Sequence, residues 1–468
     1  MAQKPGLPTG TRDLSSHEVT KRNYIMNVMR RHFECFGYQP IETPSFENAS
    51  TLMGKYGDEG DRLIFKILNS GNYFYDKNRI QLPDSLEALL THSAETISLE
   101  QRVELNRFTA KISDKALRYD LTVPFARYVV MHQNELALPF KRYQMQPVWR
   151  ADKPQKGRFR EFYQCDADVV GSTSLWQEVE LLQLYDAVFH DLGLHGVTLK
   201  LNNRKVLSGI AEVIGASDKL IDFTVALDKL DKIGETGVKD EMLAKGIPVA
   251  ALEKVQPLFS FSGSFSQKLT QLETLLHTSE IGLKGVEELR FIGAQVEKLG
   301  LQQATLELDV TLARGLNYYT GAIVEVAAPK GVQMGSIGGG GRYDDLTGIF
   351  GLKNVSGVGI SFGLDRIYLV LEELNLFPET LRTAPQFLFL NLGYNEAEVA
   401  MQAITALRRQ GISAELYPDA AKWDKQFKYA EKRGVPYVIR SIEQEVYSVK
   451  NIATGEVLAC SWEQLTAL

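Results

Sequence analysis

The stretch that decides the fold runs from Arg150 to Asp168 and reads RADKPQKGRFREFYQCDAD. The apolar pair Val148-Trp149 comes before it, and Pro154 and Gly157 mark a turn inside a polar loop. From Arg158 onward the side chains alternate between two faces, as they do along a strand. The stretch therefore predicts a β-hairpin with a long basic loop, and taken alone this pattern is typical of an ordinary charged surface hairpin.

The predicted hairpin also carries side chains that could bind a charged ligand. Arginine holds phosphate through two parallel hydrogen bonds, and a carboxylate holds an ammonium group. Both kinds of side chain stand on the neighbouring predicted strands: Arg150, Arg158, Arg160, Phe162, Gln164, Asp166 and Asp168. The rest of the chain has to decide between a solvated surface and a binding site.

The 468 residues have the composition of a globular protein of several domains, 44% hydrophobic and 24% charged, with a formal net charge of −6. This balance gives no sign of a strongly basic nucleic-acid binder, although a local basic patch can lie on an acidic protein. Three widely spaced cysteines, Cys35, Cys165 and Cys460, argue against a disulfide frame and a zinc site. No apolar run approaches the length of a membrane span and no apolar signal region follows Met1, so we expect a cytoplasmic protein without a membrane partner.

The hydrophobic pattern divides the chain into four segments. Residues 1–204 and 304–380 mix strands with helices, whereas residues 205–303 show apolar residues mainly at helical spacing. Residues 385–468 alternate apolar strands with helices and predict a small α/β domain of their own. We therefore expect two parts of one core, a helical insertion between them and a separate C-terminal domain.

Several local elements are predicted near the N-terminus. A helix over 15–36 feeds a strand over 38–43, and residues 62–76 predict a hairpin. Residues 77–113 are polar and predict a surface insertion without an assigned function, with a short helix over 85–90.

A second polar stretch, over 116–128, reads ALRYDLTVPFARY. Arg118, Asp120 and Thr122 alternate on one face of a predicted strand, and a helix begins near Val123. A solvated edge strand and the polar wall of a pocket both fit this pattern.

A glycine run and a helix start follow in the second part of the core. The four consecutive glycines of 338–341 allow the backbone to lie flat against a ligand or another strand, but they do not fit a phosphate-binding P-loop. Residues 357–363 predict a small-residue strand that turns into a helix, with Arg366 in the first turn. A cation is unfavourable at a helix N-terminus, so we expect an anionic ligand or an ion pair beside Arg366.

Three separated segments agree with each other. The helix and strand that end at Pro44, the hairpin around Arg150 and the strand entering the helix of Arg366 resemble motifs 1, 2 and 3 of the class II aminoacyl-tRNA synthetases. Two more specific segments, RGLNYYTG at 314–321 and GGGRYD at 339–344, look like the two signatures of the histidyl-tRNA synthetases. The stretches LRYDLT and KGRFREFYQ match that family too, whereas the HIGH and KMSKS signatures of class I synthetases are absent.

The resemblance covers nearly the whole chain and implies a fold, a reaction and partners. The implied fold is α+β: a class II synthetase core with an antiparallel β-sheet flanked by helices, a mostly helical insertion, and a small C-terminal α/β anticodon-binding domain. The implied enzyme is a cytoplasmic homodimer that joins L-histidine to ATP, releases pyrophosphate, and transfers histidine from the adenylate to the 3′ end of tRNA(His). Mg²⁺ is expected on the pyrophosphate part of ATP.

The resemblance also implies an ATP site. Adenylation is an in-line displacement at the α-phosphate, so catalysis depends on positioning and on neutralising charge. The implied catalytic residues are Arg150 at the α-phosphate, Arg366 at the γ-phosphate, and Arg314 between the histidine carboxylate and the α-phosphate. Arg158 is implied as a second γ-phosphate ligand, and Phe162 is implied to stack on adenine.

For histidine, the resemblance implies a group of residues at each end of the substrate. The α-ammonium group is assigned to Asp120, Thr122 and Gln164, the imidazole nitrogens to Asp168 and Tyr319, and the carboxylate to Arg314. Tyr343 is implied in the pocket floor, where a packing role fits equally well.

The chain departs from the family pattern at a few positions. Asn317 stands where the family usually has aspartate, which we expect to weaken a supporting contact without abolishing activity. Asp120 and Asp168 are aspartates where many bacterial members carry glutamate, a form typical of the eukaryote-like branch.

For tRNA, the resemblance implies contacts from the hairpin loop and from the C-terminal domain. Gln155 and Lys156 are the candidates in the loop, although a loop that only covers ATP fits as well. Lys425 and Gln426 lie on a predicted C-terminal helix that could approach the anticodon or form a solvated face.

Two other functions stay open at this point. A regulatory paralogue of the synthetase, the accessory subunit of ATP phosphoribosyltransferase, shares the core but usually lacks the C-terminal domain and loses phosphate-binding arginines. A synthetase-like RNA-binding protein without catalysis would lose those arginines too. Because Arg150, Arg314, Arg366 and residues 385–468 are all present, the sequence favours the enzyme.

Overall fold

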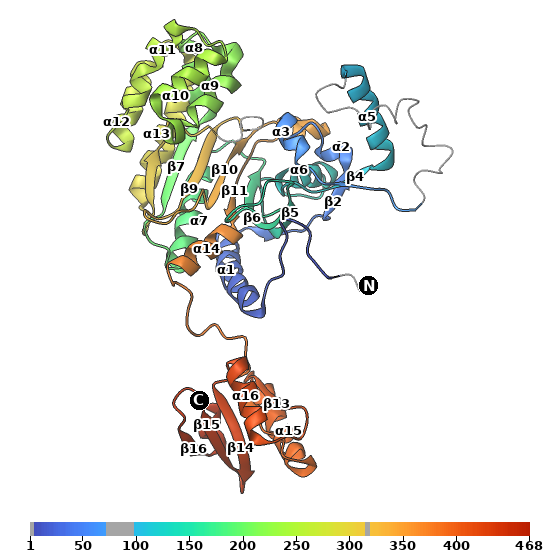
Figure 1. Ribbon diagram of the computed structural model, residues 1–468. Helices are drawn as coiled ribbons and strands as arrows, with labels where there is room; N and C mark the ends of the chain where they lie inside the picture. The colour runs from blue at the N-terminus through green and yellow to red at the C-terminus, as the bar shows by residue number, and fades with distance from the viewer. Residues whose placement is uncertain (1–3, 72–97, 314–318) are drawn as a thin grey trace. The chain divides into compact units, whose positions relative to one another are not determined.

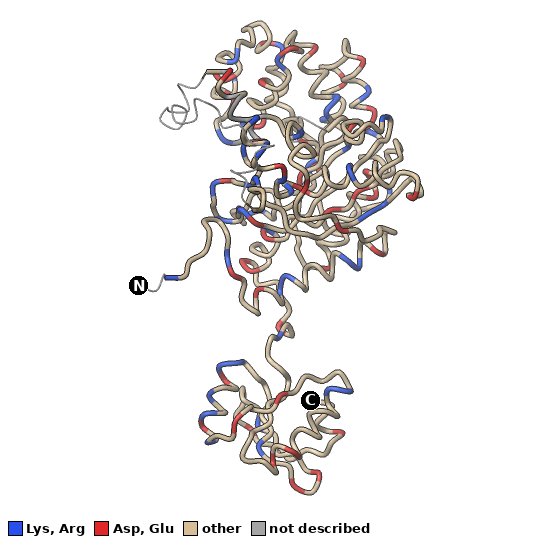
Figure 2. The backbone as a smooth tube through the Cα atoms, turned by 90° about the vertical axis from the view of Figure 1, so that its right-hand side faces the viewer, with Lys and Arg blue, Asp and Glu red and all other residues tan. Residues whose placement is uncertain are grey.

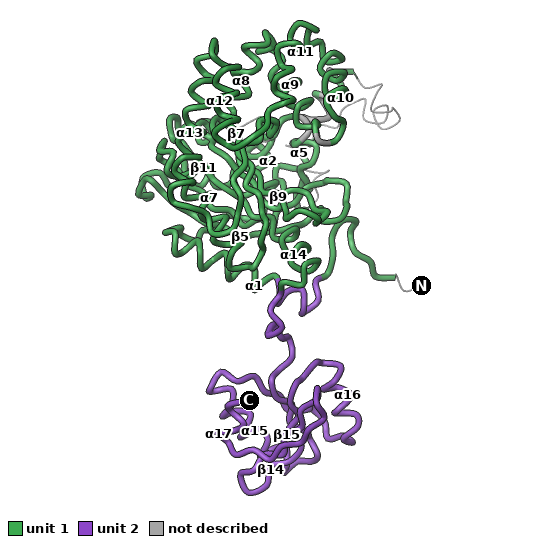
Figure 3. The backbone as a smooth tube through the Cα atoms, turned by 90° about the vertical axis from the view of Figure 1, so that its left-hand side faces the viewer, with its two compact units in different colours: residues 1–13, 22–376 green, residues 14–21, 377–468 purple. Residues whose placement is uncertain are grey.

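The computed structural model describes residues 4–71, 98–313 and 319–468. The chain forms two compact units, residues 1–13 with 22–376 and residues 14–21 with 377–468 (Figure 3). The first unit contains a large sheet and the helical insertion, and the second contains the C-terminal α/β domain.

An eight-stranded sheet forms the centre of the first unit (Figure 1). Its strands are β1 (Gln39–Pro40), β5 (Phe140–Trp149), β6 (Glu161–Val170), β7 (Thr198–Asn203), β8 (Thr305–Leu308), β9 (Ala322–Ala327), β10 (Gly338–Tyr343) and β11 (Gly357–Gly363). In the order β1-β5-β6-β11-β10-β9-β7-β8, every pair from β5 to β7 is antiparallel, and only the two edge pairs are parallel. The predicted α+β fold with an antiparallel core sheet is therefore confirmed.

The hairpin of the opening stretch provides the longest pairing in this sheet. Strands β5 and β6 are each ten residues long and pair along their whole length, ending at Trp149 and Glu161. The prediction that the second strand begins at Arg158 is wrong. Gln155 and Arg158 close a turn through two main-chain hydrogen bonds, so the strand starts only at Glu161.

Three helices lie along this sheet (Figure 1): α1 (Ser16–Cys35), α7 (Trp176–Asp191) and α14 (Leu364–Glu373). Helix α1 packs its buried Phe33 edge-on against Phe362 of β11, with ring centroids 5.8 Å apart. Tyr185 of α7 donates its hydroxyl proton toward the main-chain oxygens of Gly339 (3.1 Å) and Ser361 (2.8 Å). These contacts fix the middle strands of the sheet, where the glycine run lies.

The stretch 116–128 folds differently from its prediction. Strand β4 (Lys115–Leu117) pairs with β2 (Phe46–Asn48) and β3 (Lys66–Ile67) in a separate three-stranded sheet and ends before Arg118. Helix α6 (Thr122–Met131) follows almost at once, because Asp120 Oδ1 accepts a hydrogen bond from the N–H of Val123 in its first turn. Arg118, Asp120 and Thr122 therefore do not share a strand face, and Arg118 is completely buried.

The segment 62–113 also differs from its prediction. Strand β3 pairs with β4, so the predicted hairpin over 62–76 is not present in the described residues, and the predicted helix over 85–90 lies outside them. The described part contains a helix that the sequence analysis missed, α5 (Leu99–Ile112). A capping box explains its start, since Ser98 and Gln101 exchange side-chain to main-chain hydrogen bonds.

The insertion between β7 and β8 is helical, as predicted. It contains α8 (Arg204–Val213), α9 (Leu220–Leu227), α10 (Leu230–Ala244), α11 (Val249–Val255), α12 (Phe265–Leu275) and α13 (Glu280–Leu299). Apolar residues at helical spacing lie inside this bundle, where Phe223, Leu289 and Ile292 are completely buried, whereas Leu299 at the end of α13 is 53% exposed.

The second unit contains a five-stranded sheet of order β13-β12-β14-β15-β16. Its elements are β12 (Phe387–Phe389), α15 (Tyr394–Arg409), β13 (Ala414–Leu416), α16 (Trp423–Arg433), β14 (Tyr437–Glu443), β15 (Val446–Asn451), β16 (Val457–Cys460) and α17 (Trp462–Thr466). The first three strands in the sheet order are parallel and the last two join antiparallel. The alternation of strands and helices predicted this α/β unit correctly.

No helix within the described ranges is both long and apolar enough to cross a bilayer. Basic and acidic residues are interspersed along the backbone of each unit (Figure 2).

Candidate active site

Two adjoining cavities open beside the large sheet. The large cavity, of about 580 Å³, is lined by Asp120, Thr122, Gln164, Asp168, Tyr319 and Tyr343 among others, and the small cavity, of about 230 Å³, by Arg158, Phe162 and Arg366 among others. Four residues line both cavities: Arg150, Gln164, Gly339 and Ser361. The structure thus separates the predicted site residues into two groups that meet at Arg150.

Asp168 is a buried carboxylate of the large cavity that two protein side chains contact. Tyr343 donates its hydroxyl proton to Asp168 Oδ1 at 2.6 Å, and Arg142 Nη2 forms an ion pair with Asp168 Oδ2 at 2.8 Å. Burial raises the pKa of Asp168, and the positive charge of Arg142 opposes that rise. A Cβ at Gly359 of β11 would lie 1.9 Å from Asp168 Oδ1, so the neighbouring strand leaves room for this carboxylate only as glycine.

Asp120 forms a second carboxylate site at the start of α6. Its Oδ1 accepts the hydroxyl proton of Tyr56 at 2.9 Å and the N–H of Val123 at 3.1 Å. Burial raises the pKa of Asp120, while the hydrogen bond from Val123 and the charge of Arg150 oppose that rise.

Asp166 lies between Gln164 and Asp168 on the same face of β6. It is buried, and desolvation raises its pKa to about 7, against the lowering effect of Arg142 and with a further rise from the charge of Asp168. Gln164 Nε2 donates to Ser361 Oγ at 3.2 Å, on the strand that pairs with β6. Gln164, Asp166 and Asp168 therefore line the large cavity together, which decides between the solvated surface and the binding site that the hairpin pattern alone left open.

Arg150 is held where the two cavities meet. Its Nε donates to the main-chain oxygen of Tyr119 at 3.1 Å. Its guanidinium carbon lies 4.2 Å from the ring centroid of Tyr119 and 5.2 Å from that of Phe162. Two aromatic faces therefore fix the plane of this guanidinium in a position from which it can reach a ligand in either cavity.

The small cavity contains the other predicted phosphate-binding arginines. Arg366 donates to the main-chain oxygens of Ser336 (2.6 Å) and Gly157 (3.2 Å), so its side chain also holds the hairpin loop. Arg158 is half exposed and lies 3.8 Å from a carboxylate oxygen of Asp152. Both guanidinium groups belong to residues that line the small cavity.

The first turn of α14 contains a carboxylate, Asp365, that pairs with Arg12 and Arg22; the anionic ligand or ion pair predicted beside Arg366 stays a prediction. Asp365 accepts a hydrogen bond from Arg12 at 2.5 Å, a second from Arg22, and a third from the N–H of Tyr163 at 3.2 Å. A carboxylate in the first turn is favourable for the helix dipole. These contacts attach the N-terminal segment to the end of β6.

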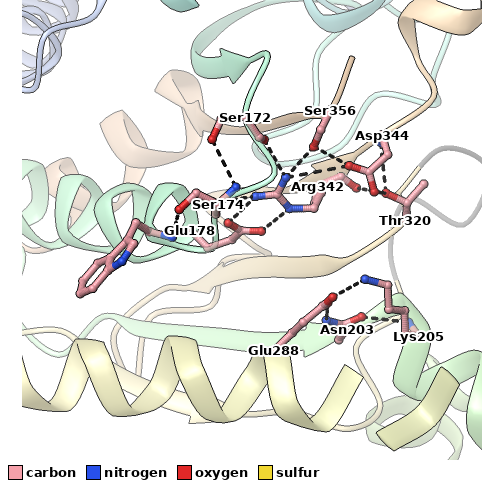
Figure 4. A network of polar contacts seen from close by, with 11 residues as sticks. Ser172, Ser174, Glu178, Asn203, Lys205, Glu288, Thr320, Arg342, Asp344 and Ser356 are labelled. Carbon is pink, nitrogen blue, oxygen red and sulfur yellow. Dashed lines mark hydrogen bonds and ion pairs between the residues drawn. The ribbon is translucent and has the colours of Figure 1, made fainter. Parts of the chain in front are cut away.

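A buried polar network lies behind the signature residues (Figure 4). Arg342 donates two hydrogen bonds to the carboxylate of Glu178, both of 2.6 Å, and a third to Ser356 Oγ. Asp344 accepts hydrogen bonds from the hydroxyls of Thr320 (2.6 Å) and Ser356 (2.5 Å). The network therefore fixes the chain neighbours of Tyr319 and Tyr343, two residues of the large cavity.

Arg314 and Asn317 lie outside the described residues. Tyr319 is the next residue of that signature within them, and it lines the large cavity.

The predicted tRNA contacts differ in their accessibility. Gln155 and Lys156 are exposed in the hairpin loop, where Lys156 Nζ lies 3.2 Å from Glu373 Oε2. Lys425 is also exposed. The prediction for Gln426 is corrected: its side chain is completely buried and exchanges two hydrogen bonds of 2.8 Å with the main chain of Asn391.

The second unit has a cavity of its own, of about 690 Å³, at the carboxyl ends of β12 and β14. Trp423 and Arg440 line it, and the Arg440 guanidinium carbon lies 4.9 Å from the centre of the Trp423 ring. Tyr394, at the start of α15, is 85% exposed. An exposed aromatic surface with a stacked arginine can accept a nucleobase.

The sequence analysis missed several residues of the site. Arg142, Tyr56 and Tyr119 were not predicted, although Arg142, Gln144 and Gln146 alternate on one face of β5. Polar residues at every second position of an otherwise apolar strand could have shown that this face borders a site.

Comparisons with known proteins agree with this geometry. A family profile described as "Histidyl-tRNA synthetase" matches residues 82–367, and one described as "Anticodon binding domain" matches residues 386–468. The histidine–tRNA ligase of Flavobacterium johnsoniae is 70% identical over 99% of both chains, and that of Christiangramia forsetii is 64% identical over 97% of both chains. The crystal structure of histidyl-tRNA synthetase from Nostoc sp. PCC 7120 matches with a TM-score of 0.80 at 28% identity, covering 100% of this chain and 99% of that chain. The chain belongs to the histidyl-tRNA synthetase family.

Proposed function

We propose that this chain is a histidine–tRNA ligase, which activates L-histidine with ATP and transfers it to the 3′ end of tRNA(His). The observation that carries the proposal is the meeting of two cavities at Arg150, one lined by buried carboxylates and the other by arginines. A histidine carboxylate in the large cavity and an α-phosphate in the small one would meet at this guanidinium. The regulatory alternative is not favoured, because relatives of 70% and 64% identity are named ligases.

In the proposed reaction, a carboxylate oxygen of histidine attacks the α-phosphorus of ATP, and the bond to pyrophosphate breaks. Arg150 neutralises the charge on the α-phosphate, and Arg366 and Arg158 bind the γ-phosphate. We assign Arg314 to the charge that develops between the histidine carboxylate and the α-phosphate. This assignment rests on the resemblance of residues 314–321 to the family signature alone. Phe162 stacks on adenine.

We assign the imidazole to Asp168 and Tyr319, beside the packed hydroxyl of Tyr343, and the α-ammonium group to Asp120, Thr122 and Gln164. A site that forms hydrogen bonds to both ring nitrogens of histidine would keep buried polar groups of its own unpaired if another amino acid bound. Such a site therefore discriminates strongly against other amino acids.

Mg²⁺ belongs to the proposed reaction as part of the ATP substrate, held on its phosphate oxygens. Within the described ranges no group of three His, Cys, Asp or Glu residues is arranged to hold a metal ion. We further propose that the protein is a cytoplasmic homodimer. Each chain is proposed to consist of two core segments, 1–204 and 304–380, an insertion, 205–303, and an anticodon-binding domain, 385–468.

The proposal is tested by ATP–pyrophosphate exchange with each amino acid supplied separately. Exchange is expected with L-histidine and Mg²⁺ and at background level with the other amino acids. If histidine supports no exchange, the ligase function is refuted and the regulatory function becomes the better explanation.

Deleting residues 385–468 is expected to spare exchange but to weaken tRNA charging. The large sheet and both cavities of the first unit consist of residues outside that segment, so adenylation should stay within about threefold of the full chain. Charging should show a much higher KM for tRNA(His). Equal charging by the truncated and full chains would refute the anticodon assignment.

In the second unit, we propose that Trp423 stacks on an unpaired base of the tRNA and that Lys425 contacts a nearby phosphate. Replacing Trp423 by alanine should weaken tRNA binding by about 1–3 kcal/mol, the usual loss for one stacked base. Tyr437→Phe, a conservative change at a half-buried aromatic of β14 in the same unit, serves as the control. Equal tRNA affinity of the Trp423→Ala variant and the full chain in filter binding would contradict the assignment.

A further inference from the structure

One carboxylate of the large cavity has no role in the reaction described so far. Asp166 lines the cavity, is 2% exposed, and stands between Gln164 and Asp168 along β6. Its Oδ1 is enclosed and has no hydrogen-bond donor among the described residues. An enclosed carboxylate oxygen without a donor is costly unless a ligand completes its contacts.

The two neighbouring carboxylates are already occupied by protein groups. Asp168 accepts a hydrogen bond from the Tyr343 hydroxyl with Oδ1, and its Oδ2, which has no hydrogen-bond donor among the described residues, forms an ion pair with Arg142. Asp120 Oδ1 accepts two hydrogen bonds, from Tyr56 and from the main chain of Val123. Asp166 Oδ1 therefore differs from them in having neither a hydrogen-bond donor nor an ion pair among the described residues, which leaves it available for a donor from the substrate.

The position of Asp166 indicates which end of the substrate it meets. Ser361, which is paired with Asp166 across β6 and β11, lines both cavities and so marks their junction. The α-carbon of histidine must lie at that junction, because its carboxylate reacts with the α-phosphate. The ring extends away from the junction toward Asp168, two residues further along the strand.

We propose that Asp166 is a further binding residue for histidine, whose carboxylate accepts a hydrogen bond from the substrate's α-ammonium group. This inference rests on the proposed function and deepens it, since Asp120, Thr122 and Gln164 alone were assigned to that group. The ammonium supplies both the missing donor and the missing positive charge.

The charged and polar groups around Asp166 support this role. The groups that act on Asp166 are Arg142 on β5, Asp168 on β6, Ser361 on β11 and Asp120 at the start of α6. Burial raises the pKa of Tyr185 on α7, and the charges of Tyr319 and Asp166 raise it further. Because burial raises its pKa to about 7 from 3.8, Asp166 is partly protonated at neutral pH. A bound ammonium would favour the charged form, so histidine binding should release part of a proton and strengthen as pH rises through 7.

The same shift has a consequence for stability. The folded-state pKa lies above the unfolded value, so the carboxylate opposes folding increasingly as pH rises from about 4 to 7, and the full cost is present above pH 7. Asp166→Asn removes that cost. The empty variant should be at least as stable as the natural chain at pH 8, while a residue with a purely structural role would lose stability.

The experiment measures the affinity of three compounds by calorimetry on the full chain. L-Histidine and L-histidinol carry the ammonium group, and imidazole-lactic acid carries a hydroxyl in its place. Asp166→Asn should weaken binding of the first two by about 10- to 100-fold and leave imidazole-lactic acid nearly unchanged. Asp166→Ser should behave in the same way, and the exposed Asp114→Asn is the control for loss of one carboxylate.

The outcomes separate this inference from the function on which it rests. Equal losses for all three compounds, or no loss for any, would overturn the role of Asp166 even if histidine still supports exchange. Absence of histidine-dependent exchange in the natural chain would refute the proposed function itself. The pH profile adds a second readout. The ratio of the natural chain's affinity for histidine to that of the Asp166→Asn variant should rise between pH 6 and 8. The ring of free histidine titrates in the same way in both experiments and cancels in this ratio, so a flat ratio would overturn the inference.

Discussion

Replacing Arg150 by alanine is expected to lower the rate of histidine-dependent ATP–pyrophosphate exchange by about 10³-fold, since removing one preorganised donor alone typically costs about 10²–10³ in kcat. Arg150 lies at the junction of the two cavities and is fixed by Tyr119 and Phe162. Its charge is therefore already in place when the α-phosphate gains negative charge. Exchange kinetics at saturating histidine and ATP measure the effect.

Two further variants show what the guanidinium contributes. Arg150→Lys keeps the charge but loses the planar fork, so its exchange rate should lie between those of the natural chain and Arg150→Ala. Arg290→Ala removes an exposed arginine of α13 and should leave exchange unchanged. If Arg150→Ala retained the natural rate, the assignment of the α-phosphate to this residue would be wrong.

Replacing Glu178 by alanine is expected to lower the free energy of unfolding by about 3–5 kcal/mol, the usual cost of removing one partner from a buried ion pair. The side chains of Arg342 and Glu178 are only 5% and 1% exposed, and two hydrogen bonds join them. Without Glu178 the guanidinium stays buried with a reduced set of partners. Chemical denaturation followed by fluorescence measures the loss, and the KM for histidine should rise because the network holds the neighbours of Tyr319 and Tyr343.

The structure offers a matched control for this prediction. Arg290 and Glu273 form the same type of pair at 2.7 Å, but both side chains are about half exposed. Glu273→Ala should therefore cost less than about 1 kcal/mol, because water screens and replaces an exposed ion pair. A double variant, Glu178→Leu with Arg342→Met, should recover part of the lost stability by removing both buried charges. Similar losses for Glu178→Ala and Glu273→Ala would contradict the argument from burial.

Local patterns predicted many elements because their causes are local. Alternation along the opening stretch predicted the hairpin, and helical spacing predicted the insertion. The strand predicted through Asp120 was wrong, because alternation does not distinguish a strand from a carboxylate that caps the next helix. Gln426 fitted a polar helix face, but its amide bonds to Asn391, which no local pattern reveals.

The sequence by itself determined the family resemblance, the α+β class and most of the chemical groups of the site. Only the tertiary structure decided what each carboxylate is available to do. Asp168 is held by Tyr343, which lies 175 positions away in the chain, and by an ion pair with Arg142 on the adjacent strand, whereas Asp166 Oδ1 has neither a hydrogen-bond donor nor an ion pair among the described residues. The reason is physical: burial, register and the partners of a charged group come from strands distant in sequence, and these decide whether a carboxylate supports the fold or receives a substrate.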